Sequence, residues 1–281
     1  MNEISIWQSL ILGIVEGITE FLPVSSTGHL TITEKLLGLS VDDPGVTAYT
    51  AIIQIGAIAA AVIYFWKDIV VIVTAFLQGV FRPEARGSAQ WRLACAVVVG
   101  SIPIAVAGLL LRDVIEGSLR SLWVVAGALI VWSGVIVFAE RAATQQRTER
   151  DVKLVDGLII GSMQVFALIP GVSRSGATIS AGLLRDLDRV TATRLSFLLG
   201  IPALTAAGVL EAVTKRDEIA AGVGWTSTIV GTIVSFGIAY VSIAWLLRFV
   251  SRNSIIPFAW YRVGAGLLLI LALSVGWVSA T

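Results

Sequence analysis

The residues from Glu16 to His29 are the part of the sequence best suited to chemistry. This stretch, EGITEFLPVSSTGH, holds two carboxylates, three consecutive hydroxyls and the only histidine of the chain. Glu16 and Glu20 lie four residues apart and therefore share one face of a helix. Close carboxylates can hold a hard divalent cation through their oxygens, or one can stay protonated beside the other. The alternative is that both are solvated residues at a surface.

The three hydroxyls stand just before a glycine, where a second helix can begin. Ser25, Ser26 and Thr27 can present hydroxyl and N–H groups to an anion at the helix N-terminus, or they can simply cap the helix. His29 lies three residues after Ser26, within one helical turn. It could act as a base for Ser26, as a proton donor to a leaving group, or as a nucleophile itself.

A second polar block, GSMQVFALIPGVSRSGAT at 161–178, repeats the first at an offset of 148 positions, so that Ser25 corresponds to Ser173. In this block Arg174 stands between two serines. Its planar guanidinium suits bidentate binding of a phosphate, and the hydroxyls of Ser173, Ser175 and Thr178 add donors. The alternative for Arg174 is a structural ion pair with a carboxylate of the first block.

Two further polar residues lie in apolar segments. Gln54 falls inside an apolar run, where it either reaches the same cavity or packs between helices. Arg262 stands near the start of the last apolar segment. It is either a second phosphate contact or an interfacial residue whose head group snorkels to water.

The composition indicates an integral membrane protein whose apolar sequence is interrupted by these two polar blocks. Of its 281 residues 56% are hydrophobic and 14% are charged, against roughly 25% charged in soluble domains. A net charge of +1 provides no basic face, so we expect no nucleic-acid partner. Isolated acids within a membrane are rare and usually functional, which favours a functional role for Glu16 and Glu20.

About twenty apolar residues cross a bilayer as a helix. Six stretches of the sequence qualify, at 47–66, 91–111, 119–139, 191–213, 225–247 and 257–279. The two polar blocks are short apolar helices broken by Pro and Gly, and we interpret each as a re-entrant hairpin whose break faces the protein interior. The predicted fold is therefore all-α, with six transmembrane helices and two re-entrant helical hairpins.

One hairpin and three spans cross the membrane an odd number of times, so the second copy must enter from the opposite side. We therefore predict an inverted-topology repeat in a single membrane domain, with halves at about 1–145 and 151–281 and a polar linker from Glu140 to Asp156. The tips of the two hairpins should converge near the midplane. Lys and Arg gather in loops opposite the termini, at 67–92 and 141–194 for example. Fewer basic residues, Lys215 and Arg216 among them, lie on the same side of the membrane as the termini. Because cytoplasmic loops carry the excess of Lys and Arg, this distribution places the termini outside.

These parts fit phosphoryl transfer from a diphosphate, where catalysis is mostly positioning and charge neutralisation. Because the site lies within the bilayer, we expect a lipid substrate whose diphosphate enters sideways between the spans while its tail remains in hydrocarbon. The alternative is a lipid flippase or transporter, since inverted repeats with broken helices are also typical of alternating access. A transporter needs no nucleophile, so the residues around Ser26 favour an enzyme.

The motifs EGITEFLPVSSTGHL at 16–30 and PGVSRSGAT at 170–178 together resemble the undecaprenyl-diphosphate phosphatase family, the bacterial membrane enzymes associated with bacitracin resistance. The resemblance covers essentially the whole chain. It implies a polyprenyl diphosphate lipid as the substrate, with hydrolysis of undecaprenyl diphosphate to undecaprenyl phosphate and phosphate, which recycles the carrier lipid for peptidoglycan synthesis. It further implies a divalent cation (Mg²⁺ or Ca²⁺), a homodimer, and a site in the bacterial plasma membrane that faces outside.

The resemblance also implies roles for individual residues. Glu16 and Glu20 are the acidic pair and the metal ligands, Ser26 is the candidate nucleophile, and His29 is the family's histidine. Arg174 is the phosphate-binding arginine. Which of Ser26 and His29 attacks phosphorus is left open.

Overall fold

The computed structural model describes residues 4–41, 43–111, 121–214 and 223–279, and this part of the chain is all-helical. Six of its helices are long and apolar enough to cross a membrane: α3 (Pro44–Tyr64), α5 (Ala89–Leu110), α7 (Leu122–Ala142), α10 (Arg189–Thr214), α12 (Trp225–Val250) and α13 (Ile256–Ser274). They match the six predicted spans to within a few residues at each end. The protein is therefore a multi-pass membrane protein. The loop at 112–120, Lys215 and Arg216, which entered the prediction of orientation, lie outside the described residues.

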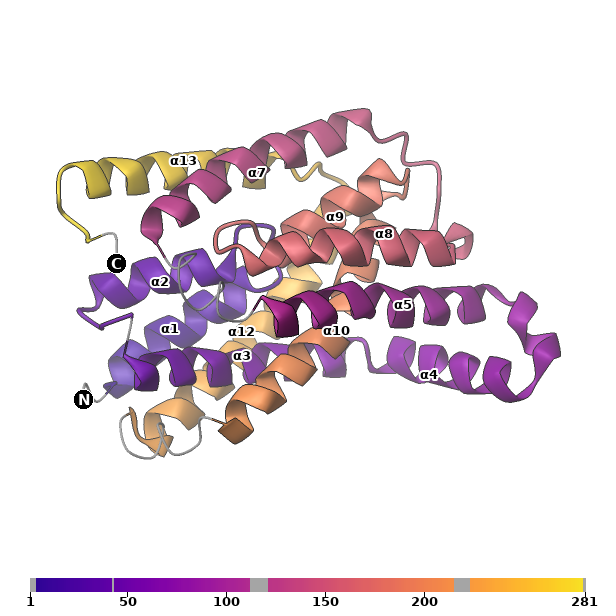
Figure 1. Cartoon of the computed structure of the whole chain (residues 1–281), viewed down its shortest axis with the longest axis horizontal. Helices are drawn as coiled ribbons and strands as arrows, with labels where there is room; N and C mark the ends of the chain where they lie inside the picture. The colour runs from indigo at the N-terminus through magenta and orange to yellow at the C-terminus, as the bar shows by residue number, and fades with distance from the viewer. Residues whose placement is uncertain (1–3, 42, 112–120, 215–222, 280–281) are drawn as a thin grey trace.

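The two polar blocks form pairs of short helices. The first pair is α1 (Ile6–Thr19) and α2 (Ser26–Leu36), and the second is α8 (Leu154–Gln164) and α9 (Arg174–Leu184). At 14 residues, α1 is about 21 Å long, too short for a hydrocarbon core of about 30 Å. Figure 1 shows α1 and α2 at the end of the molecule that carries both termini, and α8 starting from the opposite end.

The second helix of each pair begins in the same way. Ser25 and Ser173 have φ angles of 79° and 76°, in the left-handed region that residues other than glycine rarely adopt. Each serine Oγ accepts a hydrogen bond from the backbone N–H three residues later, at Gly28 and Gly176. The repeat seen in the sequence is therefore also a repeat of backbone conformation.

The first helix of each pair packs on a long helix that is distant in the sequence. Helix α1 contacts α12 through Gly13, where an added Cβ would collide with the carbonyl oxygen of Gly231. Helix α8 contacts α5 in the same manner, with Gly161 against the carbonyl of Gly100. Small residues allow such close approach of helices in membranes. Each short helix is thus held by a span from the other half of the chain.

Helix α4 (Trp66–Phe81) was not predicted. It follows α3 after a break at Phe65 and leads through the 3₁₀ helix η1 (Pro83–Gly87) into α5. The sequence expectation was wrong here because its apolar run, which follows Lys67 and Asp68, is shorter than the twenty residues used to recognise a span.

The linker between the halves is shorter than predicted. Helix α7 continues to Ala142 and α8 begins at Leu154, so both Glu140 and Asp156 lie inside helices. Both are buried because arginines neutralise them: Arg189 pairs with Glu140, and Arg147 and Arg185 pair with Asp156. Glu140 thus connects α7 to α10, and Asp156 connects α8 to the linker and to the end of α9.

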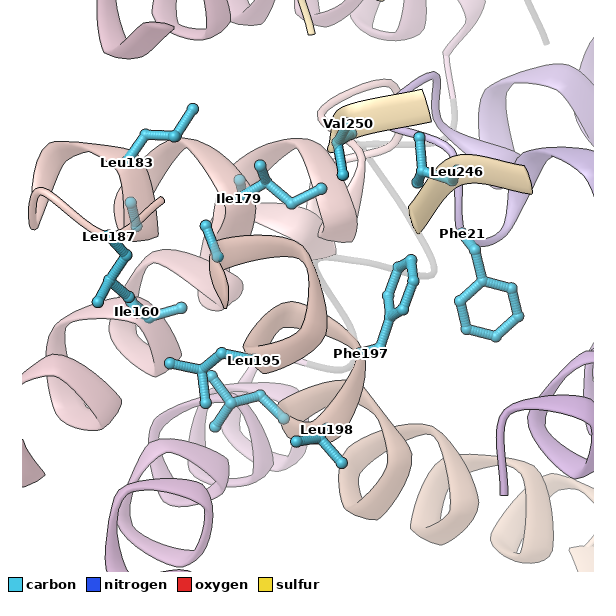
Figure 2. Close-up of a cluster of buried hydrophobic side chains, with 14 of the residues drawn as sticks. Phe21, Ile160, Ile179, Leu183, Leu187, Leu195, Phe197, Leu198, Leu246 and Val250 are labelled. Carbon is cyan, nitrogen blue, oxygen red and sulfur yellow. The ribbon is translucent and has the colours of Figure 1, made fainter. Parts of the chain in front are cut away.

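The main hydrophobic core surrounds the first turns of α10, and Figure 2 shows part of it. Phe197 of α10 lies at its centre and meets the ring of Phe21 edge to face, with centroids 5.2 Å apart. Phe21 belongs to the segment between α1 and α2. The break of the first helix pair is therefore fixed against a span from the other half.

Candidate active site

The breaks of the two helix pairs meet inside the protein, as the sequence predicts. Ser175 Oγ donates a hydrogen bond of 2.9 Å to the carbonyl of Leu22. Arg262 donates to both breaks, from Nη1 to the carbonyl of Pro23 at 3.2 Å and from Nη2 to the carbonyl of Gly171 at 2.9 Å. The segments at 20–26 and 168–174 thus form one continuous site, although they are far apart in the sequence.

Arg262 is fully buried, with no exposed side-chain surface. Besides the two carbonyls of the breaks, it donates to Ser133 Oγ at 3.3 Å and to the carbonyl of Ala128 at 3.4 Å. The snorkelling alternative is wrong, because the guanidinium lies between helices and not at a water interface. Its contact with a phosphate stays a prediction.

Glu20 is the centre of the site, at the C-terminal end of α1. Ser26 Oγ donates to its Oε2 at 2.7 Å, and Gln54 Nε2 donates to the same oxygen at 3.1 Å. Arg174 Nη2 lies 3.4 Å from its Oε1. One carboxylate therefore contacts a hydroxyl, an amide and a guanidinium from three different helices, α2, α3 and α9. The ion pair that the sequence allowed for Arg174 is present.

Several contacts fix the guanidinium of Arg174. Nη1 donates to the carbonyl of Ser196 at 3.1 Å, and Cζ lies 5.9 Å from the ring centroid of Phe21. A Cβ added at Gly200 would collide with Nη1 and Cζ, so only glycine leaves room for this arrangement. Within the described residues Nε is buried without a hydrogen-bond partner. The arginine is thus held in place while one of its donors remains unpaired.

Glu16 is buried one turn before Glu20, with 1% of its surface exposed. Neither carboxylate oxygen has a hydrogen-bond partner among the described residues. A buried carboxylate without a donor is costly unless it binds a cation or carries a proton. This agrees with both interpretations of the acidic pair. In the part of the chain that the structure describes, no group of three or more His, Cys, Asp or Glu residues could hold a metal alone.

His29 does not contact Ser26 through a hydrogen bond. Its Nδ1 lies 2.8 Å from the carbonyl of Ser25, and its Nε2 lies 2.7 Å from the hydroxyl of Tyr261. The two rings stack with centroids 5.5 Å apart and planes 13° from parallel. The hydroxyl of Ser26 donates to Glu20 and not to His29.

The remaining predicted residues differ in whether their side chains are exposed or buried. Thr27 is exposed. Ser173, Ser175 and Thr178 are buried and bonded within the protein; Ser173 Oγ lies 3.1 Å from Ser175 Oγ, and Thr178 Oγ1 lies 2.6 Å from Ser196 Oγ. These residues hold the second break together, and their contact with a substrate stays a prediction.

Sequence reasoning missed Tyr261 and Gly200. Gly200 lies in an apolar span with no nearby polar signal. Tyr261 precedes the conspicuous Arg262, and this neighbour is the one sequence signal that could have drawn attention to it.

The fold and the site together define a multi-pass membrane protein with a carboxylate, a serine and an arginine assembled between two interrupted helices. A family model described as "Bacitracin resistance protein BacA" matches residues 9–268. The chain belongs to this family, which confirms the resemblance drawn from the two motifs.

Curated relatives match over nearly their whole length. "Undecaprenyl-diphosphatase 3" of Frankia casuarinae is 55% identical over 277 residues, which cover 99% of this chain and 100% of the relative. "Undecaprenyl-diphosphatase" of Cutibacterium acnes is 55% identical and covers 93% of this chain and 95% of the relative. The protein of the same name from Acidothermus cellulolyticus is 53% identical, and the match covers the whole of both chains.

Proposed function

We propose that this protein hydrolyses undecaprenyl diphosphate to undecaprenyl phosphate and inorganic phosphate, and so recycles the carrier lipid for peptidoglycan synthesis. The observation that carries the proposal is the hydrogen bond from Ser26 to Glu20, with Arg174 on the other oxygen of the same carboxylate. The names of the relatives agree with it. A nucleophile, a base and a cationic group meet within a membrane protein, as a lipid diphosphatase requires.

In the proposed reaction Ser26 Oγ attacks the terminal phosphorus and Glu20 accepts the serine proton. The Oγ–P bond forms and the bond between phosphorus and the bridging oxygen breaks, which releases undecaprenyl phosphate. Water then hydrolyses the phosphoserine, and Glu20 returns a proton to the serine oxygen. Ser26 is preferred to His29 as the nucleophile because its hydroxyl already donates to a buried carboxylate.

Arg174 is the proposed phosphate ligand. Its contact to Glu20, at 3.4 Å, is long for a charge-assisted hydrogen bond, and no described residue accepts a hydrogen bond from its Nε. A phosphate can therefore engage this guanidinium without breaking a strong existing bond. Gln54 donates to the other carboxylate oxygen of Glu20. The residues that remain proposed contributors to the substrate site are Gln54, Ser25, Thr27, Ser173, Ser175, Thr178 and Arg262.

Glu16 and Glu20 would hold the proposed divalent cation, Mg²⁺ or Ca²⁺. The unpaired oxygens of Glu16 fit this role, and Mg²⁺ commonly binds through one or two carboxylates together with substrate phosphates. When bound, such a cation neutralises negative charge on the diphosphate.

The two helix pairs are proposed to be re-entrant hairpins of an inverted repeat. The similar φ angles of Ser25 and Ser173 and the short lengths of α1 and α8 support this interpretation. We further propose that the protein lies in the bacterial plasma membrane as a homodimer with its site facing outside. The excess of Lys and Arg in loops opposite the termini supports this orientation.

The test is release of inorganic phosphate from undecaprenyl diphosphate by the purified protein in detergent, with and without Mg²⁺ or Ca²⁺. Cation-dependent release that is lost in Arg174→Ala is expected. It should also be lost in His29→Ala, since His29 remains the proposed proton donor to the leaving group. Arg252→Ala, at an exposed position outside the site, should retain full activity. If the folded parent protein releases no phosphate under any cation, the proposal is wrong.

A further inference from the structure

Tyr261 contacts the site histidine from a helix that is remote in the sequence. It lies on α13, its residue surface is 53% exposed, and its hydroxyl is 2.7 Å from His29 Nε2. Its ring also stacks on the imidazole. Two different contacts, one polar and one aromatic, therefore act on the same side chain.

The contact made by Nδ1, the other ring nitrogen of His29, shows which of the two nitrogens always carries a proton. Nδ1 faces the carbonyl of Ser25 at 2.8 Å, and a carbonyl oxygen can only accept a hydrogen bond. Nδ1 therefore carries a proton, and Nε2 is the nitrogen that changes its protonation state. The Tyr261 hydroxyl can donate to unprotonated Nε2 and accept from protonated Nε2, so it can hold the ring in both states.

The position of Tyr261 is fixed by the next residue. Arg262 is fully buried and bonded to the carbonyls of Pro23 and Gly171. The start of α13 is thereby tied to both breaks of the site. The tyrosine ring is held at a constant place relative to α2, which carries His29.

We propose that Tyr261 is a positioning residue for His29, which keeps the imidazole oriented with Nδ1 toward Ser25 and with Nε2 as its proton-exchanging nitrogen. The inference rests on the proposed phosphatase function for its kinetic consequence, but its structural part does not. Without the tyrosine hydroxyl, the ring loses its partner at Nε2 and spends less time in the productive orientation.

The test uses Tyr261→Phe, which keeps the stacking ring and removes the hydroxyl. His29 is the only histidine, so protein labelled with ¹⁵N-histidine has a single pair of ring-nitrogen NMR signals. The parent should show a protonated Nδ1 and a hydrogen-bonded Nε2. In Tyr261→Phe the Nε2 signal should move to the position of a nitrogen without a hydrogen bond, and kcat for phosphate release should fall roughly tenfold with little change in KM.

Tyr240→Phe is the matched control, since this tyrosine is exposed on α12 and its hydroxyl makes no hydrogen bond to the described residues. It should change neither the NMR signals nor kcat. Tyr261→Leu removes the ring as well and should lower kcat further. An Nε2 signal that is the same in Tyr261→Phe and the parent would overturn the proposal, as would an unchanged kcat. A parent protein without phosphate release would refute the phosphatase instead, while the NMR comparison would still test the contact.

Discussion

The hydroxyl of Ser26 donates a hydrogen bond of 2.7 Å to Oε2 of Glu20, across the break that separates α1 from α2. The break places the two side chains face to face, because α1 ends at Thr19 and α2 begins only at Ser26. The strained φ of Ser25 starts α2 in this direction. A local interruption of the helix therefore creates the proposed nucleophile–base pair.

Glu20→Gln should remove the base while keeping the size of the side chain. We expect kcat for phosphate release to fall by about a hundredfold or more, since general base catalysis is typically worth 10²–10⁴-fold. Glu84→Gln, on the exposed η1 helix, is the control and should match the parent. A Glu20→Gln protein with parental kcat would show that Ser26 does not need this carboxylate.

Glu16→Gln should raise the cation requirement of the reaction without lowering the thermal stability of the protein. Among the described residues the carboxylate is buried without a partner, so its neutralisation should leave the melting temperature equal to or above that of the parent in the absence of divalent cations. The cation concentration needed for half-maximal phosphate release should rise about tenfold or more, because one proposed ligand becomes neutral. Thermal unfolding and a Mg²⁺ titration measure the two effects. An unchanged Mg²⁺ requirement would exclude Glu16 as a ligand.

Gly200→Ala should displace the guanidinium of Arg174. The new methyl group would occupy the space of the guanidinium, so Arg174 must move away from Glu20 and Ser196. We expect kcat/KM to fall at least tenfold or so, as for a misplaced substrate-positioning group. Gly237→Ala is the matched control on α12, where an added Cβ meets no atom within 4 Å. Equal activity of the two variants would contradict the proposed role of Arg174.

Much of the fold follows from hydropathy, but the contacts of the site do not. The spans were predictable because a run of about twenty apolar residues has the length that crosses a bilayer as a helix. The ion pair of Arg174 was foreseeable, since a buried arginine needs an anion. The partner of His29 was not, because Tyr261 lies 232 positions away and only the packing of α13 brings it near. Gly200 shows the same limit: its space is defined by a side chain from α9.

Arg262→Met should weaken the joint between the two breaks. The substitution removes donors to the carbonyls of Pro23 and Gly171 and leaves these oxygens buried. The free energy of unfolding should fall by about 2–4 kcal/mol, given 1–3 kcal/mol for each buried group left unpaired. Arg252→Met, at an exposed position, should have almost no effect. Chemical unfolding in detergent measures both. A parental unfolding free energy for Arg262→Met would show that other contacts hold the breaks together.

The most direct measurement is phosphate release from undecaprenyl diphosphate by Ser26→Ala, compared with the parent and with Ser274→Ala. Ser274 is an exposed serine whose hydroxyl donates only to a carbonyl of its own helix, so its loss should leave activity unchanged. If Ser26 is the nucleophile, its variant should retain less than about one thousandth of the parental kcat while remaining folded. Parental activity in folded Ser26→Ala would contradict the account.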